Sequence, residues 1–158
     1  MVPTFWAVLA LANAQGDKGF LYAGPYTFGN IYSKPASGTA KYSYRLGAQV
    51  ATHDALIAQA NAQGLEGYKF GGLEVFSGDA AIGGFRNVYV KDTAQASKFE
   101  WKTAAAATSP ASLVTQANTE GAAGNVYWFS VILGSAAQEL YFKPSSCTGV
   151  LCRGTSPL

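Results

Sequence analysis

The chain alternates three times between short stretches with the apolar spacing of a helix and short stretches with the alternating pattern of a strand. Each helical stretch starts at a residue type that caps helices, and nine residues later it reaches an Asn that is followed, three residues on, by Gly. Glycine there suits the left-handed residue that ends many helices. The pattern therefore predicts three helices of about ten residues each. They are bounded by Thr4 and Gly16, by Thr52 and Gly64, and by Ser109 and Gly121.

Strand patterns follow each predicted helix. The first strands cover residues 20–22, 68–70 and 126–133, and the second strands cover 30–34, 87–91 and 139–143. Two of the three copies add a third strand with strict alternation, at 41–45 and 98–102. Short links between neighbouring strands favour antiparallel hairpins. The sequence therefore predicts an α+β fold, with a mostly antiparallel sheet of about eight strands and three short helices on one face.

An internal repeat underlies this order. The segment Ala12-Asn13-Ala14-Gln15-Gly16 recurs unchanged at residues 60–64 and more loosely at 117–121. We therefore expect a single domain of three copies, covering about 4–46, 52–102 and 109–144, with a tail at 145–158. The recurrence also favours a helix over a signal peptide for the apolar residues near the N-terminus. The first copy has no strand before its helix, so the array either belongs to a longer one or is completed by unusual pairing.

The period of two along the strands sorts their side chains onto two faces. We expect the apolar face to form the core, with Ile31, Val88, Val90, Leu140, Phe142, Tyr42, Tyr44, Phe99 and Trp101. The opposite face is expected to carry Tyr32, Lys34, Lys41, Arg45, Tyr89, Lys91, Lys98, Lys102, Tyr141 and Lys143.

The distribution of charged residues makes the second face a candidate binding surface. Charged residues are only 13% of the chain and the formal net charge is +2, too small to indicate nucleic-acid binding by itself. Seven of the 11 Lys and Arg residues nevertheless fall on this one face. Lysine and tyrosine are also what solvated strands and sheet edges commonly use. The functional alternative is a platform on which phenol rings pack against sugars and ammonium groups attract an anionic polysaccharide or another surface polymer.

Few residues suggest catalysis. His53 is the single histidine, and it stands in the first turn of the second predicted helix. Glu74 and Asp79 lie in a hairpin at 71–86 that is longer and richer in Gly than its counterpart in the first copy. A surface histidine and a solvated loop are the plain interpretations. The alternative is a small hydrolase for glycosides, esters or phosphates that uses His53 or this pair of acids.

The remaining motifs bear on compartment rather than on chemistry. Cys147 and Cys152 are spaced to close a small disulfide loop, which favours an oxidising compartment. No other Cys or His lies nearby, so we expect no metal, and no cofactor motif is present. No stretch has the ~18–20 apolar residues of a membrane span. We expect a soluble protein, secreted or of the cell envelope, with self-association through its repeats as a further way to act.

The order Ala-Asn-Ala-Gln-Gly-x-x-Gly-aromatic, followed by Asn87-Val88-Tyr89-Val90-Lys91-Asp92, resembles a tandem repeat of uncharacterised secreted or envelope-associated bacterial proteins. The resemblance covers most of residues 4–144. It implies an exterior location and assigns no activity and no site residue. With a scarcity of catalytic side chains, it favours an extracellular binding or structural repeat module over an enzyme.

Overall fold

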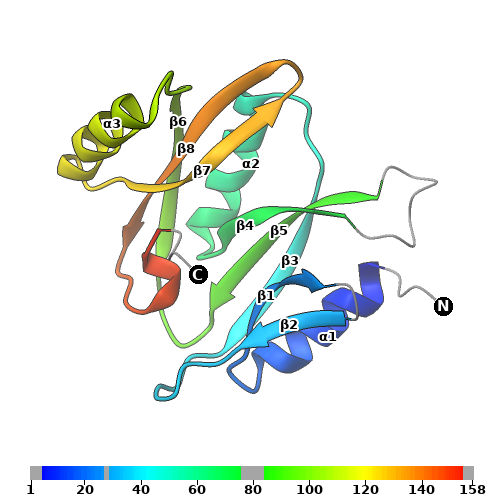
Figure 1. Cartoon of the computed structure of the whole chain (residues 1–158). Coiled ribbons are helices and arrows are strands. Elements are labelled where there is room, and N and C mark those ends of the chain that lie inside the picture. The colour runs from blue at the N-terminus through cyan, green and yellow to red at the C-terminus, as the bar shows by residue number, and fades with distance from the viewer. Residues whose placement is uncertain (1–4, 27–28, 76–83, 155–158) are drawn as a thin grey trace. The chain divides into compact units, whose positions relative to one another are not determined.

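The computed structural model describes residues 5–26, 29–75 and 84–154. This part of the chain contains three α-helices and eight strands that form antiparallel pairs, which confirms the predicted α+β class (Figure 1). The elements are α1 (Phe5–Gly16), β1 (Leu21–Tyr26), β2 (Gly29–Ser33), β3 (Tyr42–Ala48), α2 (His53–Leu65), β4 (Lys69–Val75), β5 (Phe85–Asp92), β6 (Lys98–Ala105), α3 (Pro110–Ala122), β7 (Val126–Leu133), β8 (Ala136–Ser145) and the 3₁₀ helix η2 (Val150–Cys152).

The chain divides into two compact units. The first comprises Met1–Gln49 and Phe70–Gln95, and it holds α1, the sheet β1-β2 and the sheet β3-β5-β4. The second comprises Val50–Lys69 and Ala96–Leu158, and it holds α2, α3, η2 and the sheet β6-β8-β7. The strands are thus spread over three sheets of two, three and three strands in the described part of the chain, rather than over one.

The third strands of the first two predicted copies each pair with the second strand of the next copy. In the first unit β3 pairs with β5, with Tyr44 opposite Val90. In the second unit β6 pairs with β8, with Trp101 opposite Phe142. Strands β5 and β8 are therefore the central strands of their sheets, and β3 and β6 lie at sheet edges.

Burial confirms eight of the nine residues expected in the core. Val88, Val90, Leu140, Phe142, Tyr42, Tyr44, Phe99 and Trp101 are each at most 7% exposed. The ninth, Ile31 on β2, is 48% exposed, so its expected burial is wrong. Ile31 belongs to the two-stranded sheet, whereas Val88 and Leu140 stand at the same place on the central strands β5 and β8.

The starts of α2 and α3 agree with the sequence, and the helix ends do not; Thr4, the start predicted for the first helix, lies outside the described residues. The Thr52 side chain caps α2, and Ser109 forms a capping box with Ser112 at the start of α3. Glycines 16, 64 and 121 lie within the helices, so their expected left-handed role is wrong. That role belongs to the next glycines along the chain, Gly19, Gly67 and Gly124, whose φ angles are 86°, 90° and 84°.

Candidate functional site

One contact between a helix and a strand edge occurs in both units. In the first unit, the Asn13 side chain accepts a hydrogen bond from the Tyr44 amide (2.8 Å) and donates one to the Tyr44 carbonyl (3.4 Å). In the second unit, Asn61 treats Trp101 in the same way, at 2.6 and 3.2 Å. These backbone groups lie on the free edges of β3 and β6, and an edge without partners would be open to other strands. The asparagines therefore close two sheet edges.

Glycine explains how closely the helices approach these strands. A Cβ atom on Gly16 would overlap the Tyr42 carbonyl oxygen, and one on Gly64 would overlap the Phe99 carbonyl oxygen. The neighbouring Ala60 is fully buried. The recurring segment therefore encodes a helix face that fits against strand backbone.

Tyrosines of the predicted binding face make internal contacts instead. Tyr89 and Tyr141 are both 0% exposed, so the expectation that they lie on an open face is wrong. Each packs on an aromatic ring of the neighbouring strand, Phe70 or Tyr127, with ring centroids 5.5 Å apart. Tyr32 has the equivalent partner, Tyr22, at 5.6 Å. Central strands are covered on both faces, and alternation along one strand does not reveal this.

Lys34 of the same face also has an internal role. Its Nζ donates to the Lys18 carbonyl at 2.8 Å, just beyond the C-terminus of α1, and lies 5.4 Å from the centre of the Phe20 ring. A lysine near the C-terminus of a helix stabilises the carbonyl end of the helix dipole. In the first unit Lys41 is exposed, while Arg45 and Lys91 are half-buried.

The second unit brings three predicted lysines together. Lys98, Lys102 and Lys143 are exposed on the paired strands β6 and β8, where Glu100 stands opposite Lys143. Lys102 forms an ion pair with Glu120 of α3 at 2.8 Å, and this contact lowers the pKa of the Glu120 carboxyl. Lys98 and Lys143 border a groove.

We call this hollow the α2–β6 groove. Its volume is about 440 Å³, within the range of about 300–1,000 Å³ typical of sites for small ligands. Apolar residues line it together with two lysines and one glutamate. Its lining comprises Asn61, Leu65, Lys98, Phe99, Glu100, Lys143, Pro144 and Ser145.

The residues predicted for hydrolysis are not gathered into one site by the structure. His53 is buried in the second unit, with its Nε2 3.3 Å from the Val131 carbonyl oxygen. Glu74 lies on β4 in the first unit, where burial raises the pKa of its carboxyl. Asp79 lies outside the described residues. Within residues 5–26, 29–75 and 84–154, no group of three His, Cys, Asp or Glu side chains is placed to hold a metal ion.

A buried carboxylate was missed by the sequence reasoning. Glu139 is 4% exposed and accepts hydrogen bonds from Ser130 (2.5 Å), Tyr127 (3.0 Å) and the Ala107 amide (3.2 Å). Burial alone would raise the pKa of Glu139, but these hydrogen bonds outweigh burial and lower it. In the sequence, Glu139 stands at the start of a predicted strand, directly before apolar residues. That position is the one feature that could have indicated its burial. The three hydrogen-bond donors stabilise the charged carboxylate, so we assign Glu139 a structural role.

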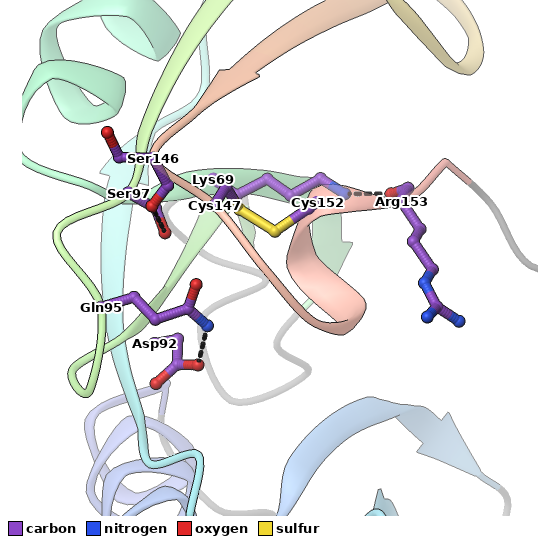
Figure 2. The surroundings of a disulfide bond; sticks show 8 residues. All are labelled: Lys69, Asp92, Gln95, Ser97, Ser146, Cys147, Cys152 and Arg153. Carbon is purple, nitrogen blue, oxygen red and sulfur yellow. Dashed lines mark hydrogen bonds between the residues drawn. A yellow bond between two sulfur atoms is a disulfide. The ribbon is translucent and has the colours of Figure 1, made fainter. Parts of the chain in front are cut away.

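The tail carries the predicted disulfide, Cys147–Cys152, which is confirmed (Figure 2). Beside it, Lys69 donates from Nζ to the Arg153 carbonyl at 2.9 Å. Lys69 is only 2% exposed, and its Nζ lies 3.7 Å from the centre of the Trp128 ring and 4.0 Å from that of Phe142. Sequence reasoning missed this lysine because it stands in an ordinary strand pattern.

Comparison with known proteins assigns no family to this arrangement. No protein-family model matches the chain, and neither the curated proteins nor the solved structures yield a match. Among the described residues, every helix is too short or too polar to cross a bilayer.

Proposed function

We propose that the chain is a binding module of the cell exterior that holds an acidic polysaccharide in the α2–β6 groove. The groove itself carries this proposal, because two lysines with exposed side chains, Lys98 and Lys143, line it together with the apolar residues Leu65 and Pro144. Acidic sugars offer the matching chemistry, since their ring carbons are apolar and their carboxylates or sulfates are anionic. The Cys147–Cys152 disulfide supports the location, because disulfides persist in oxidising compartments.

The proposed site is smaller than the binding face that the strand pattern predicts. Buried Tyr89 and Tyr141 cannot stack on a sugar, and Lys34 is used at the end of a helix. Of the lysines predicted for this face, Lys98 and Lys143 line the groove, and the outer part of the Lys143 side chain passes Gly124 just after α3. A binding role is favoured over hydrolysis because the ring of His53 is buried against the Val131 carbonyl.

The test measures binding of heparin and of polygalacturonate, with neutral dextran as the uncharged control. The doubly substituted chain Lys98→Gln, Lys143→Gln removes both ammonium groups and keeps most of each side-chain stem. The control chain Lys18→Gln, Lys41→Gln loses the same charge at exposed positions of the first unit. We expect binding at low ionic strength that weakens as salt screens the charges. The groove variant should bind about tenfold more weakly or worse, and the control should be nearly unchanged.

An equal loss in both variants would show that binding follows net charge rather than the groove. Failure of the native chain to bind either polymer at low ionic strength would overturn the proposal. Release of reducing ends during the incubation would instead support the hydrolase alternative. Far-ultraviolet circular dichroism shows whether each variant retains its fold.

A further inference from the structure

Helices α1 and α2 each contact a strand edge through an Asn and a Gly three residues later. Helix α3 has the same two residues, Asn118 and Gly121, but both are exposed. Asn118 stands where Asn13 and Asn61 stand in their helices, and Gly121 corresponds to Gly16 and Gly64. Apart from the helix backbone and adjoining residues, no described atom lies within 4 Å of the position that a Cβ would take at Gly121. The surface that covers a strand edge in the other two helices is therefore open to solvent here.

The other side of α3 is firmly held in the second unit. Gln116 accepts a hydrogen bond from the Tyr141 hydroxyl and donates one to the Ala105 carbonyl, both at 2.9 Å, and Glu120 pairs with Lys102. The capping box at Ser109 starts the helix. The exposure of the opposite side therefore does not come from a loosely attached helix.

Three residues spaced by four and three positions define the open side, which we call the α3 face: Val114, Asn118 and Gly121. This spacing places them on one stripe of the helix. Val114 is 59% exposed, and α3 has no buried residue at all. On α2, the counterparts of Val114 and Gly121 are Ile57, which is half-buried, and Gly64, which is buried. The α3 face thus has the side chains of a strand-binding surface without a strand.

We propose that the α3 face binds the edge of an extended strand from another polypeptide, one with aromatic residues at alternate positions. The occupant follows from the two equivalent contacts in this chain, where the strands are Tyr42-Ser43-Tyr44 and Phe99-Glu100-Trp101. In the docked strand, the amide and the carbonyl of the second aromatic residue bond to the Asn118 side chain. The carbonyl of the first aromatic residue lies against Gly121. This site is separate from the α2–β6 groove and does not depend on polysaccharide binding.

The surroundings of strand β2 independently support a strand of this aromatic type as the partner. Strands β5 and β8 each pair with a strand of this aromatic type, whereas β2 belongs to a sheet with only two described strands. Ile31 on β2 is 48% exposed, while Val88 and Leu140 at the same place on β5 and β8 are 7% and 0% exposed. Strands β3 and β6 use one edge for a helix and the other for a neighbouring strand. A strand held by α3 would therefore keep one edge for further pairing.

The test uses the full chain and a fluorescently labelled synthetic peptide, Ser-Lys-Phe-Glu-Trp-Lys-Thr, which copies residues 97–103. Anisotropy should show saturable binding of one peptide per chain. Gly121→Ala should abolish binding because its Cβ would meet the peptide carbonyl, while alanine favours the helix itself. Asn118→Ala should weaken binding about tenfold through the loss of two hydrogen bonds. Thr119→Ala, on the same exposed turn but off the α3 face, should bind like the native chain.

A second peptide, with serine in place of both aromatic residues, should not bind. Binding that survives Gly121→Ala would place the peptide elsewhere, for example on β2, and would overturn the proposal. No binding of the native chain at millimolar peptide would also overturn it. Neither result bears on the groove, which the polysaccharide measurement tests separately.

Discussion

Asn61 occupies both backbone hydrogen-bonding groups of Trp101, although 40 residues separate the two in the chain. The side-chain amide has one donor and one acceptor side, so it imitates a neighbouring strand at this position. Because β6 lies at the edge of its sheet, the contact satisfies polar groups that burial under α2 would otherwise leave without partners. Asn13 does the same for Tyr44.

We expect Asn61→Ala to lower the free energy of unfolding by about 2–4 kcal/mol, since it leaves an amide and a carbonyl of Trp101 unpaired. Chemical denaturation followed by tryptophan fluorescence measures this loss. The matched control is Asn118→Ala, at the same position of exposed α3, which should change stability by less than about 0.5 kcal/mol. Equal losses in the two variants would contradict the role given to Asn61.

The glycines provide a second matched pair. Gly64→Ala forces a Cβ against the Phe99 carbonyl oxygen and should displace α2 from β6, at a cost of about 1–3 kcal/mol or more. Gly121→Ala has open space around it and should stabilise α3 by up to about 1 kcal/mol, because alanine favours helix. Thermal midpoints that move in opposite directions would support this difference. A Gly64→Ala chain as stable as the native one would refute it.

Periodicity revealed most of the elements but not how they are joined. Helical spacing and strand alternation located three helices and the pattern of strands, because these signals are local. The role of Asn61 depends on a partner 40 residues away, so the sequence could mark its recurrence without giving a reason for it. The same applies to Gly64, whose conformation is ordinary and whose importance lies in the carbonyl beside it.

The candidate site was less predictable for a related reason. Alternation shows which side chains share a face, but it does not show whether another element covers that face. Tyr89 and Tyr141 were expected to be exposed and are buried, because β5 and β8 became central strands. Lys98 and Lys143 lie near the end of α2, at the groove, and stayed exposed. The spacing of Cys147 and Cys152, in contrast, sufficed to predict their pairing.

Loss of the disulfide should have a modest effect on stability. The bond closes a loop of few residues, for which the loss of chain entropy corresponds to about 2 kcal/mol. The Cys147→Ser, Cys152→Ser chain should therefore remain folded but unfold at lower denaturant. Thiol titration of the denatured native chain should find no free thiol before reduction and two after it. Two thiols without reduction would show that the bond does not form.

Lys69 makes stability depend on pH. Burial lowers the pKa of its ammonium group to about 7, from an ordinary value of 10.5. The Trp128 and Phe142 rings and the Arg153 carbonyl act in the opposite direction, because they favour the cation. The desolvation cost is the larger effect because the Nζ is almost fully buried and these neighbours are a neutral carbonyl and two neutral rings rather than a carboxylate.

The sign of the pH dependence follows from the proton count. Between pH 7 and 10 the unfolded chain keeps the Lys69 proton while the folded chain releases it, so the unfolded state binds more protons. The free energy of unfolding should therefore rise with pH, by at most about 1.4 kcal/mol per pH unit. The measurement should stop near pH 9.5, since burial raises the pKa of Tyr44 and Tyr89, and ionisation of unfolded tyrosines then favours unfolding.

Lys69→Met separates this effect from all other titrations. Methionine keeps an unbranched, apolar side chain between Trp128 and Phe142 and carries no proton to release. The advantage of the variant over the native chain, measured by denaturation at each pH, should shrink steadily from pH 7 to 9.5. A difference that stays constant over this range would mean that the rings and the Arg153 carbonyl hold Lys69 charged, and that its burial does not lower its pKa.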